Sequence, residues 1–213
     1  MVTSVSDTGP VGVLLGKGDG GFAPAQLVTG ATSSSVALAD LNGDGTLDLA
    51  KASTTTNSVS VLFGAGDGSF VESRDYATGS YPRCVTFGDV NGDGKLDLLT
   101  IDNQDNQVGV RLASGNGLFG ARVGYATESY PVHLSLADLN GDQHLDMVIV
   151  NNFAASVSVR LGLGDGAFAD KVDYPTGSFP QMAALGDLDA DGVLDLAVVD
   201  SGGISILRGV RGK

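Results

Sequence analysis

The chain has 213 residues, of which 42% are hydrophobic and 17% charged, and its formal net charge at pH 7 is −13. This composition excludes a disordered acidic chain, because enough apolar residues are present to build a core. The negative charge disfavours nucleic acid and anionic membrane as partners, since both attract basic surfaces. No apolar run is long enough to span a bilayer, so we expect no membrane insertion.

A single cysteine, Cys84, excludes an internal disulfide. Its apolar neighbours Val85 and Phe87 predict a small buried side chain rather than a reactive thiol. The first residues fall inside a repeat rather than in a signal peptide. We therefore expect a piece of a longer protein.

Residues 1–35 predict a partial unit of short strands. Val11–Leu15 is an apolar segment, and the turn Gly18-Asp19-Gly20 separates it from a second segment, Phe22–Val28. Glycines at such a turn supply the positive φ angles that a tight hairpin demands. Met1–Val5 is short and apolar enough to be the remnant of a preceding strand.

The rest of the chain repeats this pattern more completely. The expected units cover residues 36–84, 85–133 and 134–182, followed by a partial unit over residues 183–213. Each complete unit holds four short segments of period 2, rich in β-branched or aromatic residues and separated by glycine or asparagine, which is typical of strands joined by hairpins. No segment keeps a helical period. Four short strands in about 50 residues match one blade of a β-propeller.

Each unit carries one acidic loop between its first and second strands. The four loops are Asp40–Asp48, Asp89–Asp97, Asp138–Asp146 and Asp187–Asp195, and each begins 49 residues after the one before. They contain 13 of the 25 acidic residues, so the negative charge is concentrated in them.

The first loop has the oxygen donors that Ca²⁺ prefers. Asp40, Asn42, Asp44 and Asp48 place side-chain oxygens at alternate positions, and the backbone carbonyl of Thr46 lies between the last two. Ca²⁺ takes six to eight oxygen ligands, whereas transition metals would require His or Cys. The loop departs from an EF-hand, because its last carboxylate is an Asp at position nine and strands flank it. The alternative is a metal-free turn held by side-chain-to-backbone hydrogen bonds. We favour calcium because carboxylates this crowded repel one another.

An alternating strand, the pattern Asp-x-Asn-Gly-Asp-Gly-x-Leu-Asp, an apolar strand and a glycine turn together resemble the FG-GAP (VCBS-type) repeat. This is the repeat of integrin α-subunit propellers and of many secreted bacterial and fungal proteins, so the resemblance implies that the parent protein is secreted and extracellular. The resemblance covers essentially the whole chain. It implies an all-β propeller of four-stranded antiparallel blades, stabilised by Ca²⁺ in the hairpin between the first and second strands of each blade.

The resemblance assigns up to four Ca²⁺ ions to the loops. The implied ligands are Asp40, Asn42, Asp44, Thr46 and Asp48; Asp89, Asn91, Asp93, Lys95 and Asp97; Asp138, Asn140, Asp142, His144 and Asp146; and Asp187, Asp189, Asp191, Val193 and Asp195. Thr46, Lys95, His144 and Val193 would contribute only backbone carbonyls. Two loops depart from the pattern: Gln143 and Ala190 replace turn glycines. We expect the third site to be the weakest, because a side chain at positive φ is strained.

The connectors between units carry aromatic residues at one rim. Tyr81, Tyr130 and Phe179 each precede a proline. These aromatics either brace the crossing between blades or line sites against which a sugar face could stack. A phenylalanine also follows each glycine turn (Phe22, Phe70, Phe119 and Phe168), and we expect it to pack between neighbouring blades.

The strand pattern predicts 17 or 18 strands, or four to five blades. Open sheet edges must be covered. Closure could come from strand exchange, with Phe22–Val28 completing the last blade, from a five-blade ring, or from a homo-oligomer that completes the propeller.

Three functions fit the sequence. The first is a non-catalytic, adhesion- or lectin-like module that binds a glycan or an extracellular protein. The second is a repeat fragment or engineered scaffold without its own ligand. The third is a secreted enzyme of the polysaccharide lyase type, which is disfavoured because the chain has no Ser-His-Asp set and no HExxH motif and its carboxylates are committed to metal.

Overall fold

The computed structural model describes residues 2–4, 11–28 and 33–210, and this part of the chain folds into strands without a helix. It therefore contains no helix that could cross a membrane. The strands are β1 (Val2–Ser4), β2 (Val11–Val13), β3 (Gln26–Val28), β4 (Ser35–Ala39), β5 (Asp48–Ser53), β6 (Ser58–Gly64), β7 (Phe70–Ala77), β8 (Pro82–Gly88), β9 (Asp97–Asp102), β10 (Gln107–Arg111), β11 (Ala113–Gly115), β12 (Leu118–Phe119), β13 (Val123–Ala126), β14 (Pro131–Ala137), β15 (Asp146–Asn151), β16 (Ser156–Arg160), β17 (Val172–Pro175), β18 (Met182–Gly186), β19 (Asp195–Asp200) and β20 (Gly203–Leu207).

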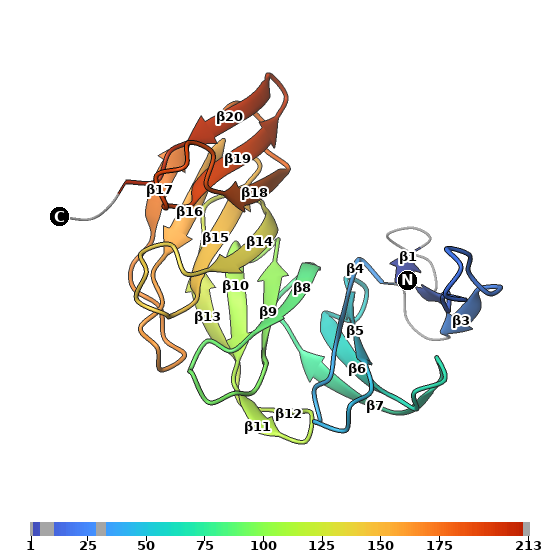
Figure 1. Cartoon of the computed structure of the whole chain (residues 1–213). Helices are drawn as coiled ribbons and strands as arrows, with labels where there is room; N and C mark the ends of the chain where they lie inside the picture. The colour runs from blue at the N-terminus through green and yellow to red at the C-terminus, as the bar shows by residue number, and fades with distance from the viewer. Residues whose placement is uncertain (1, 5–10, 29–32, 211–213) are drawn as a thin grey trace.

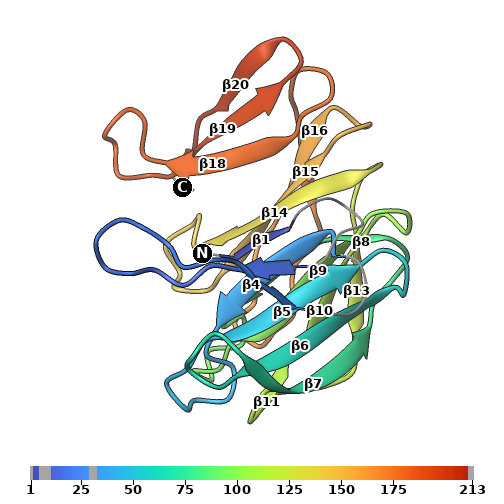
Figure 2. The same ribbon diagram turned by 90° about the vertical axis from the view of Figure 1, so that its right-hand side faces the viewer.

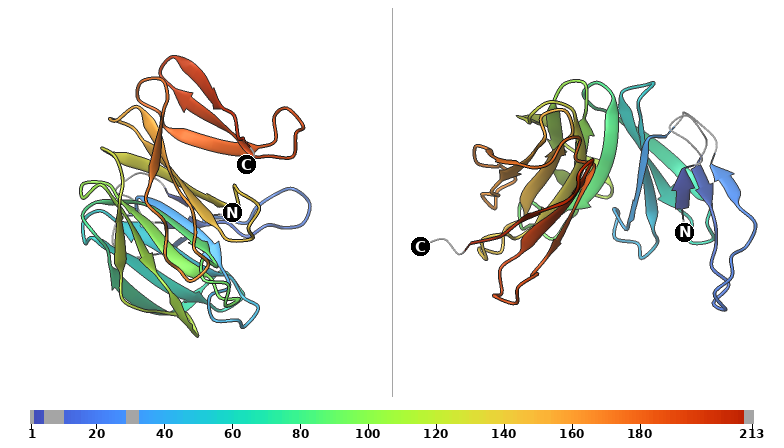
Figure 3. Two further views of the ribbon diagram at one scale, coloured as in Figure 1. Left: turned by 90° about the vertical axis from the view of Figure 1, so that its left-hand side faces the viewer. Right: turned by 90° about the horizontal axis from the view of Figure 1, so that it is seen from above.

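The strands form five consecutive antiparallel sheets. We name them sheet N (β1-β2-β3), sheet 1 (β4-β5-β6-β7), sheet 2 (β8-β9-β10-β13), sheet 3 (β14-β15-β16-β17) and sheet C (β18-β19-β20). A short hairpin, β11-β12, projects from sheet 2. Figure 1 shows the sheets following one another along an arc, with sheet N and sheet C at its two ends. Figure 2 shows the strands of sheet 1 side by side, and Figure 3 shows the arc from above.

The first strands of successive sheets contact one another along the inner side of the arc, β4 with β8, β8 with β14, and β14 with β18. The second strand of each four-stranded sheet is wholly buried, as in β9 and β15. Alternate side chains of these strands therefore pack against the preceding and the following sheet. In β15, Met147 and Ile149 pack toward sheet 2, whereas Val148 and Val150 pack toward sheet C. The core consequently lies between the sheets.

The prediction of an all-β chain built from four-stranded antiparallel sheets is confirmed. Residues 2–4, 11–28 and 33–210 contain twenty strands rather than 17 or 18, in part because β11 and β12 form an additional hairpin inside the third-to-fourth-strand turn of sheet 2. Within the described residues no strand joins sheet N to sheet C. The alternative in which Phe22–Val28 completes the last sheet of its own chain is wrong for this structure, because β3 pairs with β2 and Val28 packs against sheet 1.

Tyrosine–phenylalanine pairs connect the inner sheets. Tyr76 of sheet 1 meets the edge of Phe119 with ring centroids 5.3 Å apart, and Tyr125 of sheet 2 meets Phe168 at 5.4 Å. Both phenylalanines are buried, as predicted. The prediction is wrong for Phe22, which is 46% exposed because no sheet precedes sheet N within the described chain.

Two arginines that the sequence analysis did not single out also join neighbouring sheets. Arg111 donates hydrogen bonds to the carbonyls of Gly120 and Ala77, and so links sheet 2 to the last residue of β7. Arg160 makes the same pair of bonds one sheet later, to Ala169 and Ala126. Each guanidinium also lies over the tyrosine ring of the preceding sheet, at 5.8 Å and 5.6 Å from the centroids.

Candidate functional site: acidic loops and an aromatic cluster

The acidic loops all have the same backbone design. In the first loop Asp40 Oδ1 accepts hydrogen bonds from the backbone N–H groups of Gly43 and Asp44, and Oδ2 accepts one from Gly45, at 2.8–3.2 Å. The second and third loops repeat these three bonds. The first aspartate of each loop therefore holds the tight turn by its own side chain.

Positive φ angles allow this turn. Gly43 and Gly45 have φ of 78° and 84°, and the equivalent residues of the other loops match them. Gln143 adopts φ 71° and Ala190 adopts φ 62°, so the strain expected at these two positions is present. The Gln143 N–H still donates to Asp138 Oδ2 at 2.8 Å, as the glycine does in the other loops.

The ninth residue of each loop lies beneath it, buried. Both oxygens of Asp48 accept backbone hydrogen bonds, from Leu41 and Gly64, at 2.9 Å each. Asp97, Asp146 and Asp195 make the same two contacts at 2.7–2.9 Å. These four aspartates fasten the loop to the end of the third strand. Their coordination of calcium stays a prediction.

The electrostatics of the loops show crowding of negative charge. Burial raises the pKa of Asp97, and the neighbouring Asp93 and Asp89 carboxylates raise it further, against the hydrogen bonds from Ala113 and Val90. Burial and two neighbouring aspartates raise the pKa of Asp146 in the same way. A bound cation would relieve this repulsion, because it stabilises the charged form of every carboxylate around it.

Other carboxylates on the loops are exposed and stabilised as anions. Hydrogen bonds from the Thr46 hydroxyl and N–H lower the pKa of Asp44, and the Lys95 ammonium at 2.7 Å does the same for Asp93. In the third loop the His144 N–H lowers the pKa of Asp142. These groups offer ionised oxygens at neutral pH, which is the state that a divalent cation requires.

The fourth loop brings its carboxylates closest together. One oxygen from each of Asp187, Asp189 and Asp195 lies within 4.8 Å of the others, so one ion could contact all three. Asp189 also pairs with Arg208, which lies beyond β20. The donor set of three carboxylates fits Ca²⁺, and Arg208 would compete with the ion for one of them.

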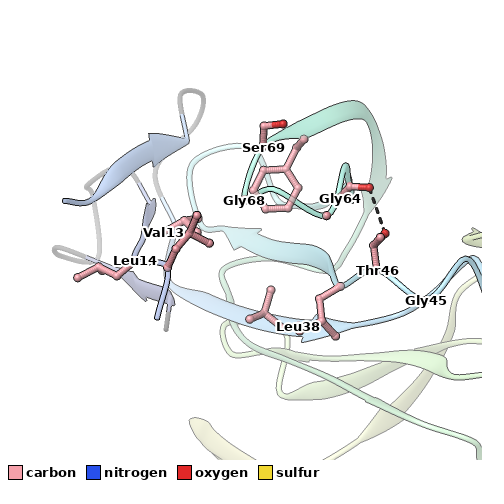
Figure 4. Close-up of a pocket in the computed structure, with 12 residues that line it drawn as sticks. Val13, Leu14, Leu38, Gly45, Thr46, Gly64, Gly68 and Ser69 are labelled. Atoms are coloured by element: carbon pink, nitrogen blue, oxygen red, sulfur yellow. Dashed lines mark hydrogen bonds between the residues drawn. The ribbon is translucent and has the colours of Figure 1, made fainter. Parts of the chain in front are cut away.

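The seventh residue of each loop lies against the glycine turn of its own sheet. The Thr46 hydroxyl donates to the Gly64 carbonyl at 3.1 Å, as Figure 4 shows. A side-chain carbon at Gly164 would collide with the His144 ring, so that ring occupies the space beside the turn. Histidine has no side-chain oxygen, so the backbone carbonyl of His144 is the oxygen that it could offer a metal. The cavity of about 380 Å³ in Figure 4 is apolar, with Val13, Leu14 and Leu38 on its walls.

An aromatic cluster lies at the opposite ends of the strands. It consists of Tyr130 before β14, Phe153 in the β15–β16 turn and Phe179 before β18. Tyr130 and Phe153 stack at 4.1 Å with their planes 11° apart, and Phe179 meets Phe153 edge-on at 6.5 Å. Phe153 is 61% exposed and Phe179 is 56% exposed. Exposed, ordered aromatic faces of this kind suit the apolar face of a sugar.

The backbone fixes the cluster in place. Tyr130 has φ 60°, its N–H donates to Asn106 Oδ1 at 2.8 Å, and its carbonyl accepts from the Asn152 N–H at 2.9 Å. The Asn152 side chain also donates to the Pro180 carbonyl, which follows Phe179. Left-handed φ angles in aromatic residues are strained, and such strain often accompanies a binding role.

The structure brings together two of the three predicted ligand-binding residues. Tyr130 and Phe179 meet through Phe153, whereas Tyr81 makes no ring contact with them among the described residues. Tyr81 keeps the same backbone conformation, with φ 59° and an N–H bonded to Asn57 Oδ1. Sequence reasoning missed Phe153, although a phenylalanine between two expected strands, in the turn Asn152–Ala155, was the available signal.

Arg83 adds a positive charge beside the cluster. Its guanidinium lies 6.0 Å from the centre of the Tyr130 ring, and Nη1 is 3.3 Å from the Tyr130 hydroxyl. The chain carries a large negative charge overall, so a cation at this position offers a local donor for a polar ligand group.

Cys84 and His133 lie partly buried in the first strands of sheets 2 and 3. Cys84 is partly buried against the core between sheets 2 and 3, and burial raises the pKa of its thiol to about 11, which agrees with the prediction of an unreactive side chain. His133 is half-buried, and burial lowers its pKa.

Comparisons with known proteins support the repeat assignment. A family model described as an FG-GAP-like repeat matches residues 2–50, 52–100, 89–149 and 138–198. The comparison with curated proteins yields no match.

Several solved structures share the fold. A lectin of Agrocybe aegerita, whose structure explains specific recognition of non-reducing terminal N-acetylglucosamine, has TM-score 0.62 and 22% identity over 93% of this chain and 60% of that one. A protein from Lactobacillus plantarum has TM-score 0.61 and 16% identity over 99% of this chain and 67% of that one. The V. cholerae biofilm matrix protein Bap1 has TM-score 0.56 and 18% identity over 92% of this chain and 29% of that one. The chain thus spans about 60% of the lectin's length.

Proposed function

Because this chain belongs to the FG-GAP-like repeat family, we propose that it is a non-catalytic, calcium-stabilised propeller module that binds carbohydrate outside the cell. The observation that carries the proposal is the exposed aromatic cluster of Tyr130, Phe153 and Phe179, whose rings form two adjoining faces held by backbone hydrogen bonds. Similarity of fold to a lectin that recognises N-acetylglucosamine adds support.

The sugar would stack on the ring of Phe153 or Phe179. Arg83 would donate to a ring or acyl oxygen of the same ligand. Aromatic stacking buries the apolar C–H face of a sugar, and hydrogen bonds from the guanidinium would fix the orientation of the sugar. The acidic loops would hold Ca²⁺ at the other edge of the sheets and so stiffen the scaffold without contacting the sugar.

A catalytic role has less support. The carboxylates of the acidic loops are hydrogen-bonded to backbone N–H groups of their own turns rather than arranged as an acid and a base around a shared cavity.

Glycan-array binding tests the proposal. We expect the wild-type chain to bind glycans with exposed terminal sugars, including N-acetylglucosamine, and Phe153→Ala to weaken binding by roughly tenfold or more, because one stacking face is lost. Val71→Ala is the control, since Val71 is also an exposed apolar residue but lies on β7 of sheet 1, away from the aromatic cluster. The carbohydrate proposal is wrong if the wild-type chain binds no glycan above background, or if Val71→Ala lowers binding as much as Phe153→Ala does.

A further inference from the structure

At the interfaces between sheets 1 and 2 and between sheets 2 and 3, a phenylalanine of the later sheet packs against the fourth-strand tyrosine of the earlier sheet. Phe168 of sheet 3 packs against Tyr125, Val110, Leu112 and Val90 of sheet 2. The turn glycine ahead of it, Gly166, makes two further bonds to sheet 2. Its N–H donates to the Val90 carbonyl at 3.1 Å, and its carbonyl accepts from the Tyr125 hydroxyl at 3.4 Å.

The interface between sheets 1 and 2 repeats this arrangement. Phe119 packs on Tyr76 and Phe63, the Gly117 N–H donates to the Leu41 carbonyl at 3.0 Å, and the Tyr76 hydroxyl donates to the Gly117 carbonyl at 3.1 Å. The same contact therefore occurs at both interfaces. A glycine turn followed by a phenylalanine packs against the preceding sheet, and the turn glycine hydrogen-bonds to that sheet.

The next interface has the receiving side without the phenylalanine. A cavity of about 310 Å³ lies between sheet 3 and sheet C, and Leu139, Val159, Leu161 and Tyr174 line its sheet 3 side. These four residues are equivalent to the residues of sheet 2 that pack against Phe168, because each lies 49 residues further along the chain than Val90, Val110, Leu112 and Tyr125, respectively. We call them the sheet 3 pocket. Sheet C has three strands in the described chain, so it supplies no fourth-strand phenylalanine there, and Tyr174 is 43% exposed.

Sheet N has the phenylalanine without a receiving sheet. Its hairpin closes with a bridge between Gly16 and Phe22, the same bridge that Gly162 and Phe168 form in sheet 3. The Ala23 N–H donates to the Leu15 carbonyl at 2.8 Å, as the Ala169 N–H does to Leu161. Phe22 is 46% exposed, whereas Phe119 and Phe168 are 9% and 7% exposed. The glycine turn ahead of Phe22 therefore already has the backbone shape of the docked turn in sheet 3, although its pairing with β2 must open before the segment can join sheet C.

We propose that the sheet 3 pocket receives Phe22 of a second copy of this chain, with the segment from Gly18 to Val28 of that copy added as the fourth strand of sheet C. The two ends of the arc lie apart (Figures 1 and 3), so the phenylalanine comes from another molecule. Gly20 is the counterpart of Gly166, so its N–H would donate to the Leu139 carbonyl and its carbonyl would accept from the Tyr174 hydroxyl.

The edge strand β20 offers the backbone groups to which the exchanged segment would pair. β20 ends the order of sheet C, and an added strand would cover its backbone groups. In sheet N Val11 is paired with Val28, and in sheet 3 Val157 is paired with Tyr174. The same register places Val28 of the second copy opposite Ile204. Releasing β3 from β2 breaks a three-residue strand and the Gly16–Phe22 bridge, and it uncovers the edge of β2. Gln26 and Leu27 are exposed, so the burial of Phe22 in the pocket is what favours the exchange. Reciprocal exchange between two copies gives a closed dimer.

Sedimentation equilibrium of the intact chain tests the proposal. We expect a concentration-dependent dimer for the wild type. Phe22→Ala should weaken dimerisation by at least about a hundredfold, because it removes a buried aromatic ring from the pocket. Leu161→Glu should weaken it as strongly, because it places a charge in an apolar pocket. Leu161 is 40% exposed in the single chain, so the variant should fold, and circular dichroism checks this.

Mixing the two variants makes the test specific. Phe22→Ala keeps an intact pocket and Leu161→Glu keeps an intact hairpin, so an equimolar mixture should form a one-to-one complex although neither variant dimerises alone. Phe153→Ala, a matched exposed phenylalanine, should dimerise as the wild type does. A wild-type chain that is monomeric at every concentration overturns the proposal, and so does a mixture that stays monomeric. Glycan binding is measured on the array and dimerisation by sedimentation, so either proposal can fail without the other.

Discussion

At the scale of single residues, the acidic loops show how far one backbone design tolerates a change of side chain. Three loops have glycine at the sixth position and the third has Gln143, yet the N–H at this position makes the same bond to the first aspartate in all four. The loop geometry therefore holds Gln143 at a positive φ angle, which a residue with a side chain disfavours. The strain is stored at φ 71°.

Gln143→Gly should raise the free energy of unfolding by about 1 kcal/mol, because glycine adopts positive φ without a steric penalty. Urea unfolding without added metal measures it. Gln104→Gly is the matched control: Gln104 is an exposed glutamine in a turn with negative φ, so glycine there should lower stability slightly. Equal effects at the two positions would contradict the strain argument.

At the scale of strands, sheet 2 contains a buried ion pair. Asp102 at the end of β9 is wholly buried, and Arg122, next to β13, donates to it at 2.5 Å. Burial raises the pKa of Asp102, whereas Arg122 and the Thr100 hydroxyl oppose that shift. The pair connects the second and fourth strands across β10, where Gly109 leaves room for the guanidinium.

Arg122→Ala should destabilise the chain by about 3 kcal/mol, because it leaves a buried carboxylate without its partner. Arg208→Ala removes an exposed pair with Asp189 and should change stability by less than about 0.5 kcal/mol. The loss in Arg122→Ala should shrink as the pH falls toward the raised pKa of Asp102, because the protonated carboxyl is easier to bury. Urea unfolding at several pH values checks both statements, and a loss independent of pH would show that packing rather than charge is responsible.

The repeat could be predicted from the sequence, whereas the contacts between sheets could be predicted only in part. Periodic strands, glycine turns and the 49-residue spacing predicted the sheets and the acidic loops, because those signals are local. Arg111 and Arg160 were missed because their partners Ala77 and Ala126 are backbone carbonyls 34 residues away, which leave no mark on a sequence. Phe153 belongs to the cluster because Tyr130 and Phe179 come from neighbouring sheets, and such proximity depends on how the sheets follow one another.

At the scale of the whole molecule, negative charge gathers along one edge of the arc. Four Ca²⁺ ions would change a formal net charge of −13 to about −5. Calcium would thus act on all four complete acidic loops together, and its effect would appear as stability rather than as a change of fold.

Calcium should raise the melting temperature of the chain and EDTA should lower it. Each fully occupied site contributes about 2.7 kcal/mol when free calcium is a hundredfold above its Kd. Calorimetric titration should show up to four sites, with the third weakest because of Gln143. Asp89→Asn with Asp93→Asn should remove one site, whereas Asp75→Asn, outside the loops, should remove none. A melting curve that is indifferent to both calcium and EDTA would disprove metal binding.

The acidic loops and the aromatic cluster lie at opposite ends of the same strands. The loops join the first strand to the second, and the cluster lies where the second turns into the third and where the first begins. Selection can therefore alter the aromatic end without disturbing the end that carries the acidic loops. A chain built this way can acquire a new specificity by a few substitutions in short turns, while the residues that keep it folded stay as they are.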